Sequence, residues 1–207
     1  MNGRVGVVVL TGPSGSGKSR VAERSGLPVV RLDDFYREAG DPGLPTIVFG
    51  EDEVVDWDDL RSWDAQAACD ALETLCTVGT VDVPVYDISL SRRTGSHTLT
   101  LGDAPTVVAE GLFAHAVVAE LERRGLLRDA LCVRHHRAVT FVLRLVRDLR
   151  EKRKSLPVLL HRGWYLMREE PAVIALAREH GCRPMTPRQA ERRIRALAGF
   201  SGANAAS

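Results

Sequence analysis

Residues 12–19 have the sequence Gly-Pro-Ser-Gly-Ser-Gly-Lys-Ser, which fits G-x-x-x-x-G-K-[S/T] at every specified position. The stretch follows a Val-rich apolar run at residues 4–10, typical of a strand buried in a parallel sheet, and a helix is expected to begin near Lys18. Glycines in such a loop let successive backbone N–H groups turn inward around phosphate oxygens. The helix that follows presents its positive end to the same anion. The sequence therefore predicts a phosphate-binding loop rather than an ordinary strand-to-helix turn.

Each polar group of this loop has an expected role. The ammonium of Lys18 is expected to reach the β- and γ-phosphates of a nucleotide, and the hydroxyl of Ser19 can ligate Mg²⁺. The residues expected to contact the nucleotide are Gly12, Pro13, Ser14, Gly15, Ser16, Gly17, Lys18, Ser19 and Arg20. The loop predicts nucleotide binding, whereas the fate of the γ-phosphate depends on other residues.

The rest of the chain predicts strands that alternate with helices. A short strand is expected at 28–32 and a turn-rich loop at 39–53. Apolar spacing indicates an amphipathic helix from Asp58 to about Val78, ended by Gly79. Later elements are an edge hairpin at 97–101 that feeds a buried strand at 106–110, and helices at 139–154 and 171–180. This alternation favours an α/β domain built from βαβ units around a mostly parallel sheet.

Acidic residues follow two of the expected strands. Asp33 and Asp34 come directly after the second strand, and Glu110 ends the strand at 106–110. Because ligands in such sheets bind beyond the carboxyl ends of the strands, these carboxylates should converge near the γ-phosphate. There a carboxylate can ligate Mg²⁺ or accept a hydroxyl proton. The alternative is that Asp33 or Asp34 caps a helix beginning near Phe35.

Composition argues against several other classes of protein. The chain has 207 residues, an average share of apolar and charged residues, and a formal net charge of +1, so neither nucleic acid nor an anionic membrane is expected as a partner. No apolar run approaches the roughly 18 residues of a membrane span, and no export signal is indicated, so a cytoplasmic location is expected. We expect one domain over residues 1–200 and a flexible tail at 201–207.

The cysteines show no pattern of a metal or disulfide framework. They form no CxxC pair and have no His cluster at zinc spacing. We expect all four to be reduced and buried, namely Cys69, Cys76, Cys132 and Cys182.

Cations gather on the expected helix at 139–154. Arg144 and Arg147 are three residues apart and therefore share one helix face. Near transferring phosphates, they would stabilise the negative charge that develops in the transition state. For the neighbouring cations, Arg150, Lys152 and Arg153, a solvated basic face is the favoured interpretation.

Together these motifs resemble the uridine kinase group of P-loop kinases, relatives of phosphoribulokinase and pantothenate kinase. The resemblance covers about residues 5–175, and it is carried by 12–19, Asp33-Asp-Phe-Tyr36, Asp56-Trp-Asp58, Pro84-Val-Tyr-Asp87, Ala109-Glu-Gly111 and Arg144-Leu-Val-Arg-Asp148. It implies a P-loop NTPase-type α/β fold in which a five-stranded parallel sheet is flanked by helices. It also implies a side hairpin over the substrate and a mobile arginine-bearing lid at about residues 144–156.

Residue roles follow from this resemblance. Asp33 is similar to the family's base for the acceptor hydroxyl. The Mg²⁺ surroundings would be Ser19, Asp33 and Glu110. Tyr36, Asp56 and Tyr86 fall where the family holds the sugar and base of a nucleoside. Arg144 and Arg147 match the lid residues that meet the phosphates, which makes them, with Asp33 and Lys18, the expected catalytic residues.

The chain also departs from the family's pattern. After Tyr86-Asp87 the family has an aromatic residue and then a His before a Ser-Arg pair, whereas this chain has Ile88 and Ser91-Arg92-Arg93. This weakens the case for uridine, and we expect Arg93 to contact the substrate. In the lid, Lys152-Arg153-Lys154 replaces Arg-Gly-Arg, so either Arg153 or Lys154 takes the distal phosphate role. Each tryptophan, Trp57, Trp63 and Trp164, is open between core packing and ligand contact.

The sequence therefore predicts an ATP- and Mg²⁺-dependent kinase that transfers the γ-phosphoryl group to a hydroxyl of a small molecule. The favoured acceptor is the 5′-hydroxyl of a ribonucleoside, and a homo-oligomeric state is left open. One alternative is a kinase for another small alcohol, such as a sugar phosphate or a pantothenate-like acid. Another is a non-catalytic nucleotide-binding switch, against which Asp33 argues because a switch needs no acceptor base.

Overall fold

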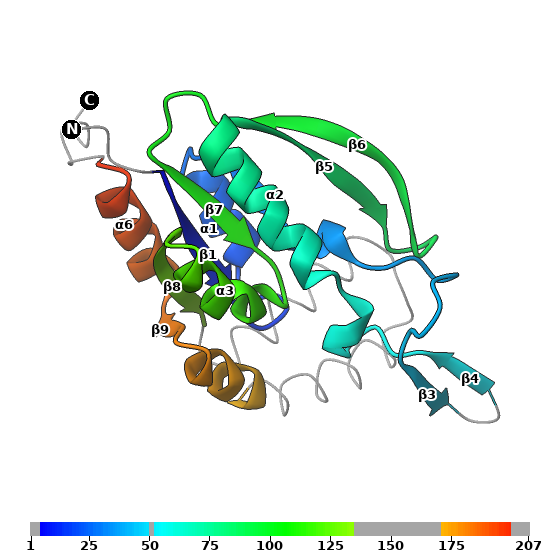
Figure 1. The fold of residues 1–207 in the computed structure, drawn as a ribbon. Coiled ribbons are helices and arrows are strands. Elements are labelled where there is room, and N and C mark those ends of the chain that lie inside the picture. Colours follow the sequence, from blue (N-terminus) through cyan, green and yellow to red (C-terminus); the bar gives the residue numbers. More distant parts are fainter. Residues whose placement is uncertain (1–4, 50–51, 135–170, 200–207) are drawn as a thin grey trace.

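The computed structural model describes residues 5–49, 52–134 and 171–199, and its centre is a parallel sheet (Figure 1). The strand order is β2-β7-β1-β8-β9, and every neighbouring pair is parallel. The strands are β1 (Gly6–Thr11), β2 (Val29–Arg31), β7 (Thr106–Glu110), β8 (Leu127–Val133) and β9 (Arg183–Met185). The prediction of a five-stranded parallel sheet in an α/β fold is confirmed.

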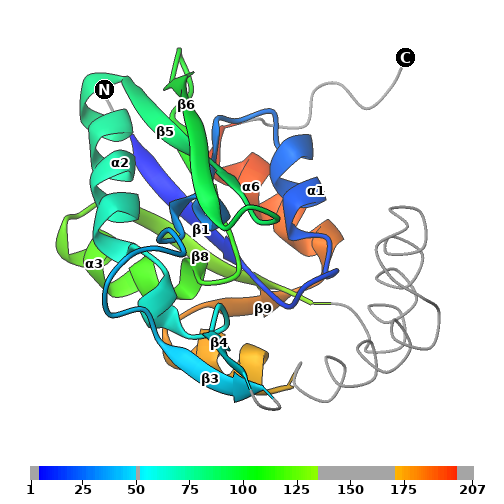
Figure 2. The same ribbon diagram turned by 90° about the vertical axis from the view of Figure 1, so that its right-hand side faces the viewer.

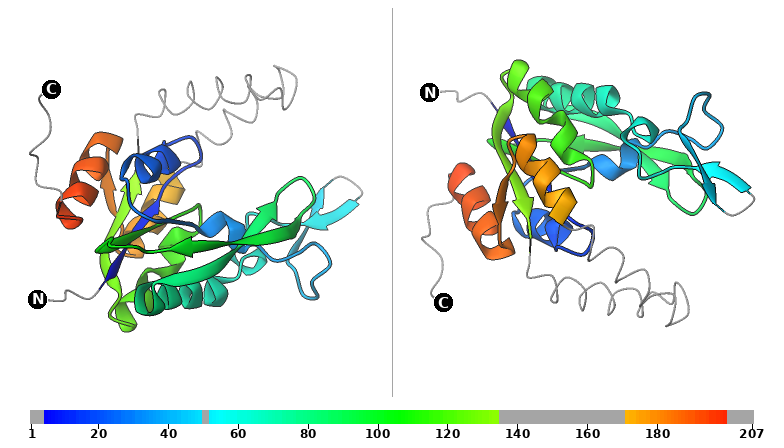
Figure 3. Two further views of the ribbon diagram at one scale, coloured as in Figure 1. Left: turned by 90° about the horizontal axis from the view of Figure 1, so that it is seen from above. Right: turned by 90° about the horizontal axis from the view of Figure 1, so that it is seen from below.

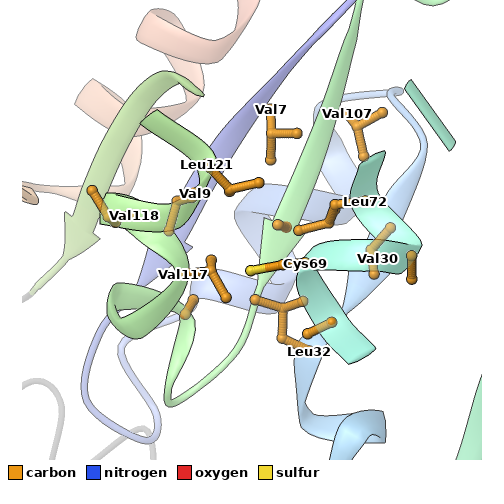
Figure 4. Close-up of a cluster of buried hydrophobic side chains, with 14 of the residues drawn as sticks. Val7, Val9, Val30, Leu32, Cys69, Leu72, Val107, Val117, Val118 and Leu121 are labelled. Carbon is orange, nitrogen blue, oxygen red and sulfur yellow. The ribbon is translucent and has the colours of Figure 1, made fainter. Parts of the chain in front are cut away.

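Helices cover both faces of this sheet, which explains the unbroken apolar runs of β1 and β7 (Figure 3). On one face lie α2 (Ala65–Val78), α3 (Val118–Arg123) and the helix at 171–179, and on the other lie α1 (Lys18–Arg24) and α6 (Pro187–Leu197). Val7 and Val9 pack with Leu72 and Leu121 on the first face (Figure 4). Val8 and Leu10 alternate with them and pack toward α1 and α6.

The amphipathic helix begins later than its apolar spacing predicts. Asp64 caps α2 by accepting a hydrogen bond from the backbone N–H of Ala67 at 2.9 Å, so the helix cannot include Leu60 or Trp63. Residues Leu60–Ser62 form a separate 3-10 turn, η2. The other end is confirmed, because Gly79 terminates α2 with a left-handed φ of 87°.

Two antiparallel hairpins stand outside the sheet (Figure 2). The strands β3 (Thr46–Phe49) and β4 (Asp52–Val55) form the first, so the prediction of a turn-rich loop at 39–53 holds for residues 39–45 and is wrong for the strand residues that follow. The described side chains of this hairpin are almost all exposed, so no buried face imposed a detectable apolar pattern on its sequence.

The second hairpin is the side hairpin that the resemblance implied, but its partners differ from those expected. β6 (Arg92–Thr100) pairs with β5 (Thr80–Asp87), not with residues 106–110. The fully buried residues of β7 belong instead in the centre of the sheet, beside β1. The sequence analysis also assigned no strand to β5, β8 or β9 and no helix to α6.

The sequence analysis also made predictions about membrane helices, the cysteines and the later helices, and not all of them hold. The described part of the chain contains no helix long and apolar enough to cross a membrane. None of the four cysteines, all of them in the described part of the chain, forms a disulfide; three are buried, but Cys76 is only half-buried. The helix at 171–179 is confirmed. The expected helix at 139–154, the lid at 144–156 and the tail at 201–207 lie outside the described residues.

A charged contact fastens the C-terminal segment to the sheet. Asp129 of β8 is 8% exposed and accepts from the guanidinium groups of Arg183 of β9 and Arg193 of α6. The distance from Arg193 Nε to Asp129 Oδ2 is 2.6 Å. One buried carboxylate thus holds the last strand and the last helix.

Replacing Asp129 by Asn is expected to lower the free energy of unfolding by about 1–3 kcal/mol, because two charge-assisted hydrogen bonds lose their anionic acceptor. Urea titration measures the change. The matched control is Glu191→Gln, which removes an exposed ion pair to Arg24 at 3.5 Å. That control should cost less than about 1 kcal/mol. Equal losses in the two variants would contradict the role given to Asp129.

Candidate active site

The loop between β1 and α1 has the backbone that its glycines predict. Gly12, Gly15 and Gly17 have φ values of 147°, 78° and 86°, a region that L side chains rarely adopt. A Cβ on Gly12 would lie 2.3 Å from the carbonyl oxygen of Val133, because the loop packs against the end of β8. The loop therefore needs glycine both for its conformation and for this close approach.

One hydroxyl of the loop is buried without a partner. No described residue hydrogen-bonds to the Ser16 hydroxyl. No side chain caps the N-terminus of α1. Lys18 is 9% exposed at the start of that helix. An unsatisfied buried hydroxyl beside a confined ammonium fits a polyanion such as a triphosphate.

Ser19 and Glu110 meet across the gap between α1 and β7. Ser19 Oγ donates to Glu110 Oε2 at 3.2 Å. Glu110 is 4% exposed, and this burial raises the pKa of its carboxyl, while the nearby ammonium of Lys18 acts in the opposite direction. A hydroxyl and a carboxylate are hard oxygen donors, the kind that Mg²⁺ prefers. This donor set fits a Mg²⁺ ion next to the loop.

Asp33 lies in the short 3-10 turn η1 (Leu32–Phe35), which directly follows β2. Its Oδ1 accepts from the backbone N–H of Leu112 at 2.8 Å. A Cβ on Gly111 would lie 2.8 Å from the same oxygen, so only glycine lets the carboxylate come this close. The charge of Asp33 also raises the pKa of Glu110, which places the two carboxyls within electrostatic reach. The structure thus brings Ser19, Asp33 and Glu110 to one edge of the sheet, together with Lys18.

Asp34 makes different contacts from Asp33, with Tyr86 and Arg31. Its Oδ1 accepts from the backbone N–H of Tyr86 at 3.3 Å, and its Oδ2 lies 3.8 Å from Arg31 Nε. Burial raises the pKa of this carboxyl. Asp34 therefore ties η1 to the side hairpin rather than joining Asp33. Neither acid caps a helix, because both lie inside the 3-10 turn, whose N-cap is Arg31.

Aromatic rings gather beside Asp33. Tyr36 is the centre of the group, with ring centroids 6.0 Å from Trp57, 5.7 Å from Tyr86 and 5.9 Å from Phe113. Burial, and then the charge of Asp33, raise the pKa of Tyr36. The sequence analysis did not single out Phe113, although its position just after Glu110, at the end of a buried strand, was a usable signal.

Tyr86 and Asp56 are each held by the local backbone. The hydroxyl of Tyr86 donates to the carbonyl of Arg37 at 3.1 Å. Asp56 Oδ1 accepts from the backbone N–H of Asp58 at 3.1 Å, which fixes the turn that carries Trp57. Tyr86 is itself one of the clustered rings, and Asp56 precedes Trp57 in the chain; that these residues hold a substrate stays a prediction.

Arg93 lies in a groove of its own. The groove is about 540 Å³ and runs between α2 and the β5–β6 hairpin. Its lining contains neither Tyr36 nor Tyr86, and no residue of the phosphate-binding loop. Arg93 is nevertheless the register partner of Tyr86 across the hairpin, and its charge acts to lower the pKa of that phenol. The structure therefore brings Arg93 beside Tyr86, although Arg93 lines a separate groove.

The expected lid residues cannot be placed in this site. Arg144, Arg147, Arg153 and Lys154 lie outside the described residues, as do Arg150, Lys152 and Trp164. Trp63, in contrast, is a core residue: it is 4% exposed, and its Nε1 donates to the carbonyl of Leu32 at 2.6 Å.

Comparison with known proteins yields distant relatives. No protein-family model matches the chain. The chain is 25% identical over 169 residues to a uridine kinase from Clostridium tetani, covering 78% of this chain and 76% of that protein. It is 23% identical over 161 residues to a uridine kinase from Shewanella baltica, covering 72% of each.

Among solved structures, the fold is similar to that of a protein from Silicibacter sp. TM1040 described provisionally as a fructose transport system kinase. The TM-score is 0.57, the sequence identity is 15%, and 88% of each chain is covered. At this identity the likeness concerns the fold alone.

Proposed function

The chain is a P-loop kinase similar to the uridine kinases, a phosphotransferase that acts on an alcohol group, and from this premise we propose that it phosphorylates ribonucleosides. In this proposal ATP supplies the γ-phosphoryl group, and the 5′-hydroxyl of the ribonucleoside receives it. The observation that carries the proposal is the position of Asp33, which is fixed by the N–H of Leu112 and whose charge acts on both Glu110 and Tyr36.

The loop and its neighbours would bind the triphosphate. Its backbone N–H groups and the ammonium of Lys18 hold the β- and γ-phosphates. Ser19 and Glu110 are the residues that would hold Mg²⁺, with Asp33 in its surroundings. When bound, Mg²⁺ neutralises charge on the phosphates. Catalysis of this kind depends on positioning and electrostatics rather than on a covalent intermediate.

Asp33 would act as the base. Its Oδ1 is already engaged by the N–H of Leu112, which fixes the orientation of the carboxylate. Oδ2 is then the oxygen that accepts the proton of the attacking hydroxyl as its oxygen bonds to the γ-phosphorus, while the bond from that phosphorus to the β–γ bridging oxygen breaks and ADP leaves. Gly111 supports this arrangement, because a side chain there would displace Asp33.

The aromatic group favours a ribonucleoside over a simple sugar. Ring surfaces lie close to Asp33, on Tyr36, Tyr86 and Trp57. Stacking on such surfaces would stabilise the binding of a nucleobase. The relatives named above are uridine kinases, and a nucleoside acceptor agrees with that name.

A coupled assay of ADP release tests the proposal. The enzyme, ATP and Mg²⁺ are combined with uridine, cytidine, adenosine or guanosine, or with no acceptor. We expect ADP release to depend on a ribonucleoside, and phosphorus NMR to show a 5′-monophosphate product. Release that is equal with and without an acceptor, or that needs a different small alcohol, would contradict the proposal.

A further inference from the structure

Two tryptophans, Trp57 and Trp63, contact rings of the aromatic group, and they differ in burial and in hydrogen bonding. Trp63 is buried, and its indole N–H has an acceptor, the carbonyl of Leu32. Trp57 is half-buried, and no residue in the described part of the chain accepts from its Nε1. Since tryptophan nitrogen is a donor only, the Trp57 N–H is available to an acceptor atom of a ligand.

The ring of Trp57 also has uncovered surface. Its centroid lies 6.0 Å from that of Tyr36, and the two planes meet at 78°. In such an edge-to-face pair, Tyr36 can cover at most one face of the indole. No second ring contacts Trp57 among the residues that the structure describes. Because Trp57 is only half-buried, part of this large aromatic ring is accessible to a planar partner.

Position connects this open face to the reaction. Tyr36 follows η1, the turn that carries Asp33, and the charge of Asp33 influences the phenol of Tyr36. The ring of Trp57 contacts the ring of Tyr36, and Tyr36 is the neighbour of Asp33, the proposed general base.

The turn of the side hairpin offers no competing ring. It carries Ile88, which is 76% exposed, and Ser91, whose Oγ donates to the carbonyl of Ile88 at 3.4 Å within the turn. The hairpin turn therefore supplies no aromatic face for a planar acceptor, whereas the segment between β4 and η2 supplies the half-buried ring of Trp57.

We propose that Trp57 is a specificity-determining residue that stacks on the base of the acceptor and donates from Nε1 to a carbonyl oxygen or ring nitrogen at its edge. The inference rests on the proposed function and names the chemical class of acceptor, a ribonucleoside with a flat conjugated base. Stacking tolerates different bases because each has a π face. Uridine, cytidine and purine nucleosides are therefore all expected to bind.

The test compares two acceptors in four enzymes. The acceptors are a ribonucleoside and methyl β-D-ribofuranoside, which has the same 5′-hydroxyl but no base. The enzymes are the wild type, Trp57→Ala, Trp57→Phe and, as the matched control, Trp63→Phe. Each is assayed for kcat and KM with both acceptors and for the KM of ATP.

Trp57→Ala is expected to lower kcat/KM for the nucleoside roughly 5- to 150-fold, mainly through KM, as loss of one stacked ring does. The KM of ATP and the turnover of methyl ribofuranoside should not change. Trp57→Phe keeps a ring and loses one donor, so its loss should be at most about tenfold. Trp63→Phe should lower the thermal midpoint and leave the preference between the two acceptors unchanged.

Fluorescence provides a readout that is independent of turnover. A nucleoside should quench the tryptophan emission of the wild type and of Trp63→Phe, and the quench should be absent in Trp57→Phe. An unchanged nucleoside KM in Trp57→Ala, or an equal loss with methyl ribofuranoside, would overturn the role of Trp57. A wild-type enzyme that phosphorylates no ribonucleoside would overturn the proposed function, and this inference with it, before any variant is compared.

Discussion

Replacing Asp33 by Asn should lower kcat by about 10²- to 10⁴-fold, the usual cost of losing a general base. An asparagine has nearly the same shape, and its Oδ1 can still accept from the N–H of Leu112. It cannot take a proton from the acceptor hydroxyl. ATP affinity, measured by calorimetry, and the thermal midpoint should therefore stay close to those of the wild type.

The neighbouring acid provides the control for this prediction. Asp34→Asn keeps an oxygen that can accept from the N–H of Tyr86 and removes a charge from the half-buried seam between η1 and the side hairpin. Its effect on kcat should be much smaller than that of Asp33→Asn. If Asp34→Asn proved the more damaging of the two, the roles of the two acids would have to be exchanged.

The contrast between these two acids shows how far the sequence could predict the site. The position of both after a buried strand placed them at the correct edge of the sheet. Which of them faces the loop depends on the path of η1 and on the close approach at Gly111. That approach joins residues far apart in the chain, so no local pattern encodes it.

The fold shows the same division between local and long-range signals. β1 and β7 were predictable because burial on both faces leaves an unbroken apolar run. β9 was missed because it has only three residues and none of them is fully buried, so its sequence carries no apolar pattern; Arg183 anchors it to Asp129 of β8. The pairing of β6 with β5 rather than with residues 106–110 was likewise undetectable, because the solvent-facing side chains of β6 carry no alternation.

The second large effect is expected from Lys18→Ala. The ammonium is confined at the start of α1, beside the carboxyl of Glu110 and a loop in which the Ser16 hydroxyl has no partner among the described residues. Its removal takes a largely buried positive charge from the place where the β- and γ-phosphates are expected. Loss of one such electrostatic group costs about 10²- to 10³-fold in kcat. ATP binding should weaken as well, because the ground-state triphosphate loses the same contact.

Arg24→Ala separates this effect from a general loss of positive charge on α1. Arg24 is at the far end of the same helix, where it forms an exposed ion pair with Glu191 at 3.5 Å. A charge in that position is screened by solvent, so the control should change ATP affinity by less than about fivefold. Calorimetry with ATP and single-turnover kinetics compare the two variants directly. Undiminished ATP affinity together with persistent turnover in Lys18→Ala would mean that residues 12–19 do not hold the phosphates of ATP.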